Sequence, residues 1–209
     1  MNYPIQRPLH PLHINTSRWS SLEGAMGTPR YINVPIKHDK SSPRPGNSPR
    51  PVEPPRITIH FDSGRGTPGV SFGDAKNGKL HWMGDQFIPE LLNLGQNSVN
   101  LVIYWPGYGH VQNTFPLEIC VNNRPVTRAY LAQQVAKAYE RFFDAARKAT
   151  YAGTRNENGT TWEIGRNYSH MHFVLRSISN VHLHDRGVFQ ADIQILMAVN
   201  AVDVEERSK

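Results

Sequence analysis

Proline is concentrated in the first part of the chain, where eleven of the sixteen prolines precede Ile57. The stretch KSSPRPGNSPRPVEPPR, which ends at Arg56, offers almost no side chain that a hydrophobic core could bury. Such a composition cannot offset the entropy that is lost when a backbone is ordered. We therefore predict that Lys37–Arg56 is a disordered segment with local polyproline-II character, and that the folded domain follows it.

Residues 8–36 differ from that segment because they carry apolar side chains. The stretches LHPLHINTSRW and RYINVPI hold enough Leu, Ile, Trp and Tyr to dock a strand or a loop on a domain. We expect a basic, proline-rich tail over residues 1–56, with a docking segment near residues 8–36, and one domain over residues 57–209. A single core is also what 209 residues with 38% apolar side chains predict.

The positive charge of the chain belongs to the tail. Residues 1–56 hold eight Lys and Arg against three acidic residues, whereas residues 57–209 hold fifteen against fourteen. The composition of the domain therefore indicates no basic face, and we expect nucleic-acid binding to be weak and confined to the tail. The sequence has no apolar run long enough to span a membrane and no amino-terminal secretory signal. We expect an intracellular protein, cytoplasmic or nuclear.

After residue 57 the pattern is that of strands and one helix. Strand patterns occur in ITIHFD, SVNLVIYW, FPLEICV, SHMHFVLRSI and GVFQADIQILMAV. Thr127 is a suitable cap for a helix whose apolar side chains recur at spacings of three and four: Leu131, Val135, Ala138, Phe142 and Ala145. We predict a single α+β domain, in which a mainly antiparallel sheet is covered by one long amphipathic helix over Arg128–Ala149.

The segment GDAKNGKL supports two interpretations. Gly73, Gly78 and Lys79 fill the glycine and lysine positions of the phosphate-binding pattern GxxxxGK[ST], which would hold ATP or GTP with magnesium. The next residue is leucine, whereas the pattern needs a hydroxyl for magnesium, and no helical period follows. Asn77-Gly78 is typical of a two-residue turn, which would make Val70–Met83 a hairpin. We favour the hairpin and no cofactor, with the nucleotide site as the alternative.

The proline-rich segment contains motifs for partner binding. Pro51, Pro54 and Arg56 fit the ligand pattern PxxPxR, in which two prolines fill aromatic grooves and the arginine meets an acidic pocket. Ser42 and Ser48 each precede a proline and lie near arginines, so they are candidate phosphorylation sites. We expect a protein partner for this segment, and the alternative is an inert spacer.

Histidines are clustered near the carboxyl end, in His170-Met171-His172 and His182-Leu183-His184. Two histidines separated by one residue share a strand face, as in many metal sites. The two pairs do not converge, whether Ser179-Asn180 is a tight turn or residues 179–187 are a loop, so we predict no metal site. Cys120 lies in an apolar run and is expected to be a reduced, structural thiol.

Four stretches of the domain resemble uncharacterised proteins of mushroom-forming (basidiomycete) fungi: ITIHFD, WPGYGHV, RPVTRAYLAQQVAKAYERF and ISNVHLHDRGVFQADIQI. A fruiting-body-inducing regulatory protein is similar more distantly. The resemblance implies a regulatory role and transfers no catalytic residue. We therefore favour a non-enzymatic interaction or regulatory protein, with two alternatives: a nucleotide-binding regulatory protein or enzyme that uses GDAKNGKL, and a nucleic-acid binder that uses the tail.

Overall fold

The computed structural model describes residues 30–36, 56–62, 69–84, 86–153, 162–164, 172–180 and 187–197. Residues Tyr31–Leu196 form one compact unit that contains a seven-stranded sheet. The strands of this sheet are β1 (Arg30–Asn33), β2 (Thr58–His60), β3 (Val70–Ser71), β4 (Ser98–Val102), β5 (Thr114–Glu118), β8 (Phe173–Asn180) and β9 (Val188–Met197).

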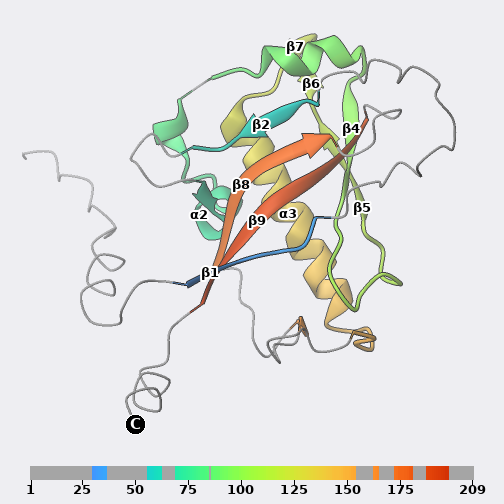
Figure 1. Ribbon diagram of the computed structural model, residues 1–209. Helices are drawn as coiled ribbons and strands as arrows, with labels where there is room; N and C mark the ends of the chain where they lie inside the picture. The colour runs from blue at the N-terminus through green and yellow to red at the C-terminus, as the bar shows by residue number, and fades with distance from the viewer. Residues whose placement is uncertain are drawn as a thin grey trace, which may run out of the picture. The chain divides into compact units, whose positions relative to one another are not determined.

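The sheet is mainly antiparallel. Its central path runs β2, β8, β9, β4 and β5, while β1 pairs with β9 and β3 pairs with β8 (Figure 1). Strand β8 is antiparallel to β2, β3 and β9, and β4 is antiparallel to β5. The pair of β4 and β9 is parallel. The fold is therefore mixed α/β, as the sequence predicts at this coarse level.

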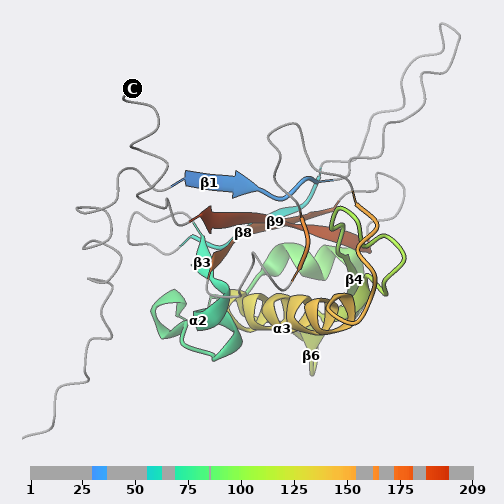
Figure 2. The same ribbon diagram turned by 90° about the horizontal axis from the view of Figure 1, so that it is seen from below.

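Two helices, two 3-10 turns and a small ribbon complete the described part of the unit. They are the helices α2 (Phe72–Lys76) and α3 (Arg128–Ala146), the 3-10 turns η1 (His81–Met83) and η2 (Pro89–Leu94), and the two-stranded ribbon of β6 (Cys120–Val121) and β7 (Arg124–Pro125). Helices α2 and α3 lie on the same side of β8 and β9 (Figure 2).

Strand β9 shows how the sequence pattern defines the two faces of the sheet. Phe189, Ala191, Ile193 and Ile195 are buried, as their alternation predicts. On the other face Asp192 and Gln194 are partly exposed, but Gln190 is only 4% exposed. The strand is therefore more buried than the half-exposed strand that its polar residues suggest.

Helix α3 packs on this core through a broad apolar face. Thr127 caps it, because its hydroxyl accepts a hydrogen bond from the N–H of Tyr130. The helix ends at Ala146, before the expected end at Ala149. Ala145, expected to be buried, is exposed and Ala146 is buried instead. The reason is the helical period of 3.6 residues, which brings the fourth residue after Phe142 closer to its face than the third.

An aromatic cluster joins α3 to both the sheet and α2. The ring of Phe143 lies 5.1 Å from that of Trp105 and 5.2 Å from that of Phe173 in β8. The ring of Phe72 in α2 lies 5.3 Å from Tyr139 and 5.7 Å from Phe173. Most of these rings meet edge to face, an arrangement that adds to the free energy of burial.

The sheet also takes a strand from the segment that the sequence assigned to the tail. Strand β1 pairs with β9, the N–H of Val34 donates to the carbonyl of Ile193 at 3.0 Å, and the Val34 side chain is buried. RYINVPI therefore docks as a strand. The folded domain therefore begins before Ile57, because β1, which lies far from β9 in the sequence, pairs with the edge of β9.

The buried hydroxyl of Tyr139 makes the stability depend on alkaline pH. Burial and, to a lesser extent, the negative charge of Asp192 raise the pKa of Tyr139 above its usual 10.0. Above pH 10 the unfolded chain therefore releases this proton while the folded chain retains it. The free energy of unfolding then falls by up to about 1.4 kcal/mol per pH unit. Below pH 10 Tyr139 keeps its proton in both states, so the stability of the fold is not reduced there by this group.

We expect Tyr139→Phe to remove this dependence. Urea denaturation of the wild type and the variant at neutral pH and above pH 10 measures it. The two proteins should have similar stability at neutral pH, and the wild type should lose more of its stability as the pH rises. Parallel losses in both proteins would show that Tyr139 is not the group responsible.

Candidate functional site

The proline-rich segment is held at both ends by the same sheet. Before it, β1 pairs with β9; after it, the carbonyl of Ile57 accepts a hydrogen bond from the N–H of Asn180 in β8 at 3.0 Å. The segment is therefore a connection between two strands, and the description as a tail is wrong in this respect. Arg56 is exposed. The other predicted site residues of the segment lie outside the described residues: Ser42, Ser48, Pro51 and Pro54.

An apolar hollow of about 420 Å³ lies where the chain leaves β1. Its walls include Pro35, Ile36, Tyr104, Trp105, Pro106 and Asn113. Ile36 is the last described residue before the proline-rich segment, so the hollow lies at the base of that segment. Apolar walls with one amide side chain are typical of sites that take a ring or an aliphatic side chain.

The wall of this hollow is fixed by hydrogen bonds to neighbouring parts of the chain. Trp105 Nε1 donates to the carbonyl of Trp162 at 2.7 Å, and the hydroxyl of Tyr108 accepts from the N–H of Ile164 at 3.1 Å. The carbonyl of Gly107 accepts from Ala152 at 3.0 Å. The loop of WPGYGH is therefore preformed and needs no ordering on binding.

GDAKNGKL is a capped helix, and the predicted hairpin is wrong. Residues Phe72–Lys76 form α2, and Asn77 has a φ of −83°, whereas a two-residue hairpin turn requires positive φ. Gly78, with a φ of 67°, follows the helix. Its N–H donates to the carbonyl of Ala75 and that of Lys79 donates to Asp74, which is the Schellman arrangement of a helix end.

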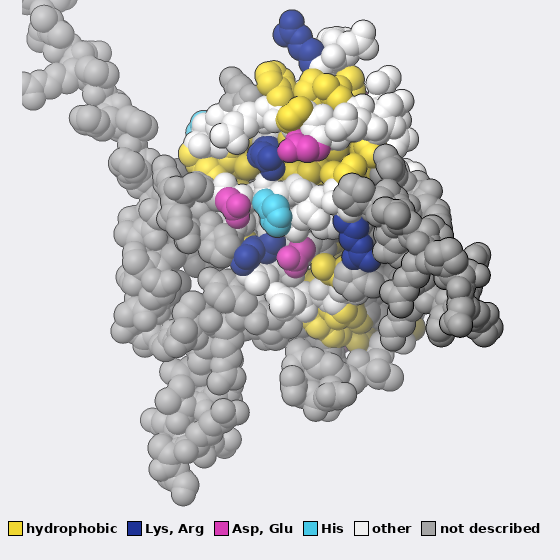
Figure 3. Space-filling view, turned by 45° about the horizontal axis from the view of Figure 1, so that its top comes forward, with side chains coloured by type: hydrophobic (Ala, Val, Ile, Leu, Met, Phe, Trp, Pro, Cys, Tyr) yellow, Lys and Arg dark blue, Asp and Glu magenta, His cyan; other side chains and the backbone are white. Residues whose placement is uncertain are grey.

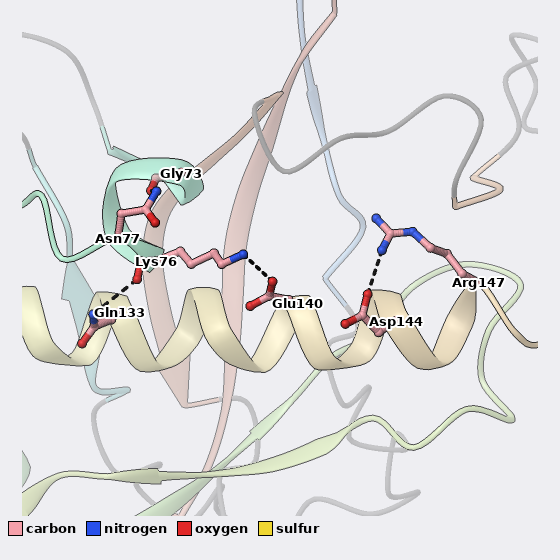
Figure 4. A network of polar contacts seen from close by, with 7 residues as sticks. All are labelled: Gly73, Lys76, Asn77, Gln133, Glu140, Asp144 and Arg147. Carbon is pink, nitrogen blue, oxygen red and sulfur yellow. Dashed lines mark hydrogen bonds and ion pairs between the residues drawn. The ribbon is translucent and has the colours of Figure 1, made fainter. Parts of the chain in front are cut away.

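Tertiary contacts hold this short helix on α3 (Figure 4). Lys76 Nζ forms an ion pair with Glu140, and Gln133 Nε2 donates to the carbonyl of Lys76 at 3.3 Å. Both α3 residues come from the helix's partly buried side. These contacts, with Phe72 in the aromatic cluster, explain why a five-residue helix forms here.

The backbone geometry of GDAKNGKL can also be compared with that of a phosphate-binding loop. A phosphate loop directs free backbone N–H groups at the phosphates. Here the N–H groups of Asn77, Gly78 and Lys79 donate to carbonyls of the segment itself. Gly73 lies inside α2, and Lys79 is exposed and followed by the buried Leu80. The arrangement gives phosphate binding no support.

We expect Gly78→Val to lower the free energy of unfolding by about 1–2 kcal/mol, because a β-branched residue is strained at positive φ. Lys79→Ala is the matched control on an exposed neighbour and should change stability little. Urea denaturation measures both effects. Calorimetric titration with magnesium-ATP and magnesium-GTP should give no heat for the wild type; binding that Lys79→Ala abolishes would restore the nucleotide interpretation.

The prediction from sequence missed a serine motif. Gly69–Gly73 reads GVSFG and so matches the GxSxG pattern of nucleophilic serines. The structure places Ser71 at the end of β3, directly before α2, the context in which that pattern is informative. Its φ and ψ of −67° and 141° are ordinary extended values, and its Oγ accepts from the N–H of Asp74 at 3.0 Å. Ser71 is thus the amino-terminal cap of α2.

Ser71→Ala should therefore lower the free energy of unfolding by about 1 kcal/mol, whereas Ser71→Asp, which also caps helices, should retain it. Thermal or urea denaturation compares the two. A fluorophosphonate probe should leave the wild type unlabelled. Labelling that Ser71→Ala abolishes would show instead that the serine is a nucleophile.

The glycines Gly64, Gly66 and Gly69 also follow β2 in the spacing GxGxxG. Of these three, only Gly69 lies within the described ranges. It has a φ of 90°, and a Cβ there would lie 2.6 Å from the carbonyl oxygen of Leu175, so close packing on β8 explains this glycine. Strand β3 follows it directly, whereas a dinucleotide turn would open a helix.

The predicted histidine pairs are mostly outside the described residues, which include only His172. Strand β8 continues through Asn180, so the tight turn considered at Ser179-Asn180 does not form. In the described ranges, no group of three or more potential metal ligands occurs. Cys120 is a free thiol in β6 and is partly exposed rather than buried.

The actual two-residue hairpin turn of the described chain joins β6 to β7. Asn122 and Asn123 both have positive φ, 51° and 59°, as this turn requires. The ribbon continues to a third segment, since Phe87 pairs with Thr127 and Ile88 donates to Val126. The pair Asn122-Asn123 could have indicated this turn in the sequence, but the prediction placed the hairpin turn at Asn77-Gly78 instead.

One face of this ribbon is buried and the opposite face is aromatic and acidic. Ile88, Ile119 and Val126 are 0–5% exposed. Alternation places Phe87, Glu118, Pro125 and Thr127 on the other face, where Tyr130 of α3 donates its hydroxyl to Glu118 Oε2 at 2.9 Å. We call Phe87, Glu118 and Tyr130 the aromatic–acidic face. The hydrogen bond to Glu118 is the main cause of a raised pKa of Tyr130.

Large exposed apolar side chains lie on the elements around this face, although alternation puts one of them, Val121, on the opposite side of the ribbon. Phe87, Leu92, Val121 and Tyr130 are 40–51% exposed, and they are the large exposed apolar side chains of the described part of the chain. All four belong to η2, the ribbon or the start of α3. Figure 3 shows hydrophobic side chains gathered near the top of the view, with acidic and basic side chains among them. Such clustering is typical of interaction sites.

Comparison with known proteins gives no family for this chain. No protein-family model matches the sequence, and no curated protein and no solved structure is significantly similar to it. Among the described helices, none is long and apolar enough to cross a lipid bilayer.

Proposed function

We propose that this is a non-enzymatic interaction protein that presents Lys37–Arg56 to a protein partner as a polyproline-II ligand. One observation supports the proposal most: the strands on both sides of the segment belong to the same sheet. The scaffold in this proposal is a single α+β domain whose antiparallel sheet is covered by the amphipathic helix α3.

The physical argument concerns the cost of ordering the ligand. A proline-rich segment already favours the extended form that its partner binds, so little conformational entropy is lost on binding. Attachment at both ends restricts the conformations of the segment further, which lowers the entropy that binding must remove. From Pro51 to Arg56 a polyproline-II helix spans about 15 Å, enough for two proline pockets and an acidic pocket.

Two further features fit a regulatory role. Phosphate on Ser42 or Ser48 would bring negative charge next to Arg44 and Arg50 and would weaken attraction to an acidic partner. The resemblance to proteins of mushroom-forming fungi is consistent with a role in developmental regulation, which we include in the proposal.

The test uses the full chain and a panel of recombinant SH3 and WW domains in calorimetric titrations. We expect at least one domain to bind with a Kd in the micromolar range, and Pro51→Ala with Pro54→Ala to weaken that binding at least about tenfold. Pro43→Ala with Pro45→Ala is the matched control, because it changes prolines outside PxxPxR. Absence of binding to every domain, or equal losses in both variants, would contradict the proposal.

The charge of residues 1–56 favours nucleic acid as a second candidate partner. Single-stranded DNA of mixed sequence is a suitable probe. Binding that falls steeply with salt and is lost when Arg44 and Arg50 are replaced by glutamine would support it. Binding that is insensitive to salt would exclude it.

A further inference from the structure

The aromatic–acidic face combines two exposed rings with a carboxylate in one small area. Phe87 lies directly across from Thr127, and Tyr130 is one helical turn after Thr127. Phe87 is 51% exposed and Tyr130 is 40% exposed. Exposed aromatic rings are the kind of side chain that proline rings contact in proline-rich ligands.

Glu118 is held in a fixed position beside Tyr130. The side chain of Gln134 bonds its backbone twice at 2.8 Å: Oε1 accepts from the N–H of Glu118 and Nε2 donates to the carbonyl. An adjacent strand would make the same two bonds, so Gln134 takes the place of a neighbour at the edge of β5. Tyr130 occupies Glu118 Oε2, which leaves Oε1 for a cation.

The ligand that matches these groups is a proline-rich peptide that ends in arginine. The two rings suit two prolines, and the carboxylate suits the guanidinium. This chain carries such a peptide, from Pro51 to Arg56. We propose that the aromatic–acidic face binds the Pro51–Arg56 segment of a second copy of this protein. The inference rests on the proposed function, whose ligand it shares.

The sheet explains why the ligand comes from a second copy. One row of paired residues crosses the sheet from β2 to β5 through Ile57, Asn180, Phe189, Leu101 and Phe115. This row covers four strand spacings, about 19 Å, and Glu118 lies farther along β5. Arg56 precedes Ile57 at the opposite edge, so its side chain does not reach the Glu118 of the same chain.

Sedimentation velocity of the full chain over a range of concentrations tests the inference. We expect the wild type to associate, and Arg56→Glu or Glu118→Arg alone to weaken association at least about tenfold. The double variant should regain it, because the two charges are exchanged. Arg124→Glu, at the exposed turn of the ribbon, is the charge-matched control. Should Glu118→Arg fail to fold, Glu118→Gln keeps the shape and should weaken association as well.

Mixing gives a second test that is independent of charge rescue. A copy with Phe87→Ser and Tyr130→Ser lacks the two rings but keeps the ligand. A copy with Pro51→Ala and Pro54→Ala keeps the rings but lacks the ligand. Each should be monomeric alone, and the mixture should form heterodimers. A wild type that stays monomeric, or association that survives either pair of changes, overturns the inference. If the wild type stays monomeric but still binds an SH3 domain through Pro51 and Pro54, the proposed function holds and only the inference of self-association fails.

Discussion

Replacing Phe143 with alanine should lower the free energy of unfolding by about 3–5 kcal/mol, which is among the largest effects of a single side chain. Phe143 is 2% exposed and its ring meets those of Trp105, Tyr139, Phe142 and Phe173. Its removal leaves a cavity where α3 meets the sheet, and rings on several elements cannot all move to fill it. Urea denaturation followed by circular dichroism measures the loss.

Phe87→Ala is the matched control for Phe143→Ala. It removes the same atoms from a side chain that is 51% exposed, so we expect a loss below about 1 kcal/mol. Equal losses in the two variants would show that the aromatic cluster does not stabilise the fold in the way described.

Gly107→Ala should lower the free energy of unfolding by about 2–5 kcal/mol, since strain at positive φ and overpacking act together. Gly107 has a φ of 84°, and a Cβ there would lie 2.2 Å from the ring of Tyr151 and 2.8 Å from the N of Gly153. The backbone atom cannot give way without breaking the bond between Ala152 and Gly107, which holds the loop at the hollow.

Gly109→Ala provides the control two residues away. A Cβ at Gly109 meets nothing within 4 Å, so this variant should keep nearly the stability of the wild type in the same urea titration. A small loss for Gly107→Ala would mean that Tyr151 rearranges freely. A large loss for Gly109→Ala would show that the loop tolerates no side chain at either glycine.

Parts of the candidate site could be predicted only as motifs. The motif PxxPxR was identified from the sequence pattern. The attachment of its segment at both ends depends on strand β1, which the sequence predicted only as a docking segment. The aromatic–acidic face was not predicted at all. Phe87, Glu118 and Tyr130 are far apart in the chain, and no local pattern marks residues that meet through a ribbon and a helix start.

GDAKNGKL shows how local signals can conflict. Asn-Gly fits a hairpin turn and equally the end of a helix, because both need a residue at positive φ. The serine and aspartate of Ser71–Asp74 have the spacing of a capping box, a signal for a helix start that the hairpin interpretation ignored. Contacts of Lys76 and Phe72 with α3 resolve the conflict in favour of the helix.

The sequence by itself determined the elements whose signal is local. Helix α3 follows from its period and the cap at Thr127, and β9 follows from its alternation, because both patterns record which side chains one element buries. The tertiary structure decided β1, α2 and the exposed face of the ribbon. Each depends on a partner far along the chain: β9 for the strand, α3 for the short helix, and residues 86–88 for the ribbon. Long-range pairing leaves little trace in local composition, since its free energy comes from surfaces that meet only after the chain has folded.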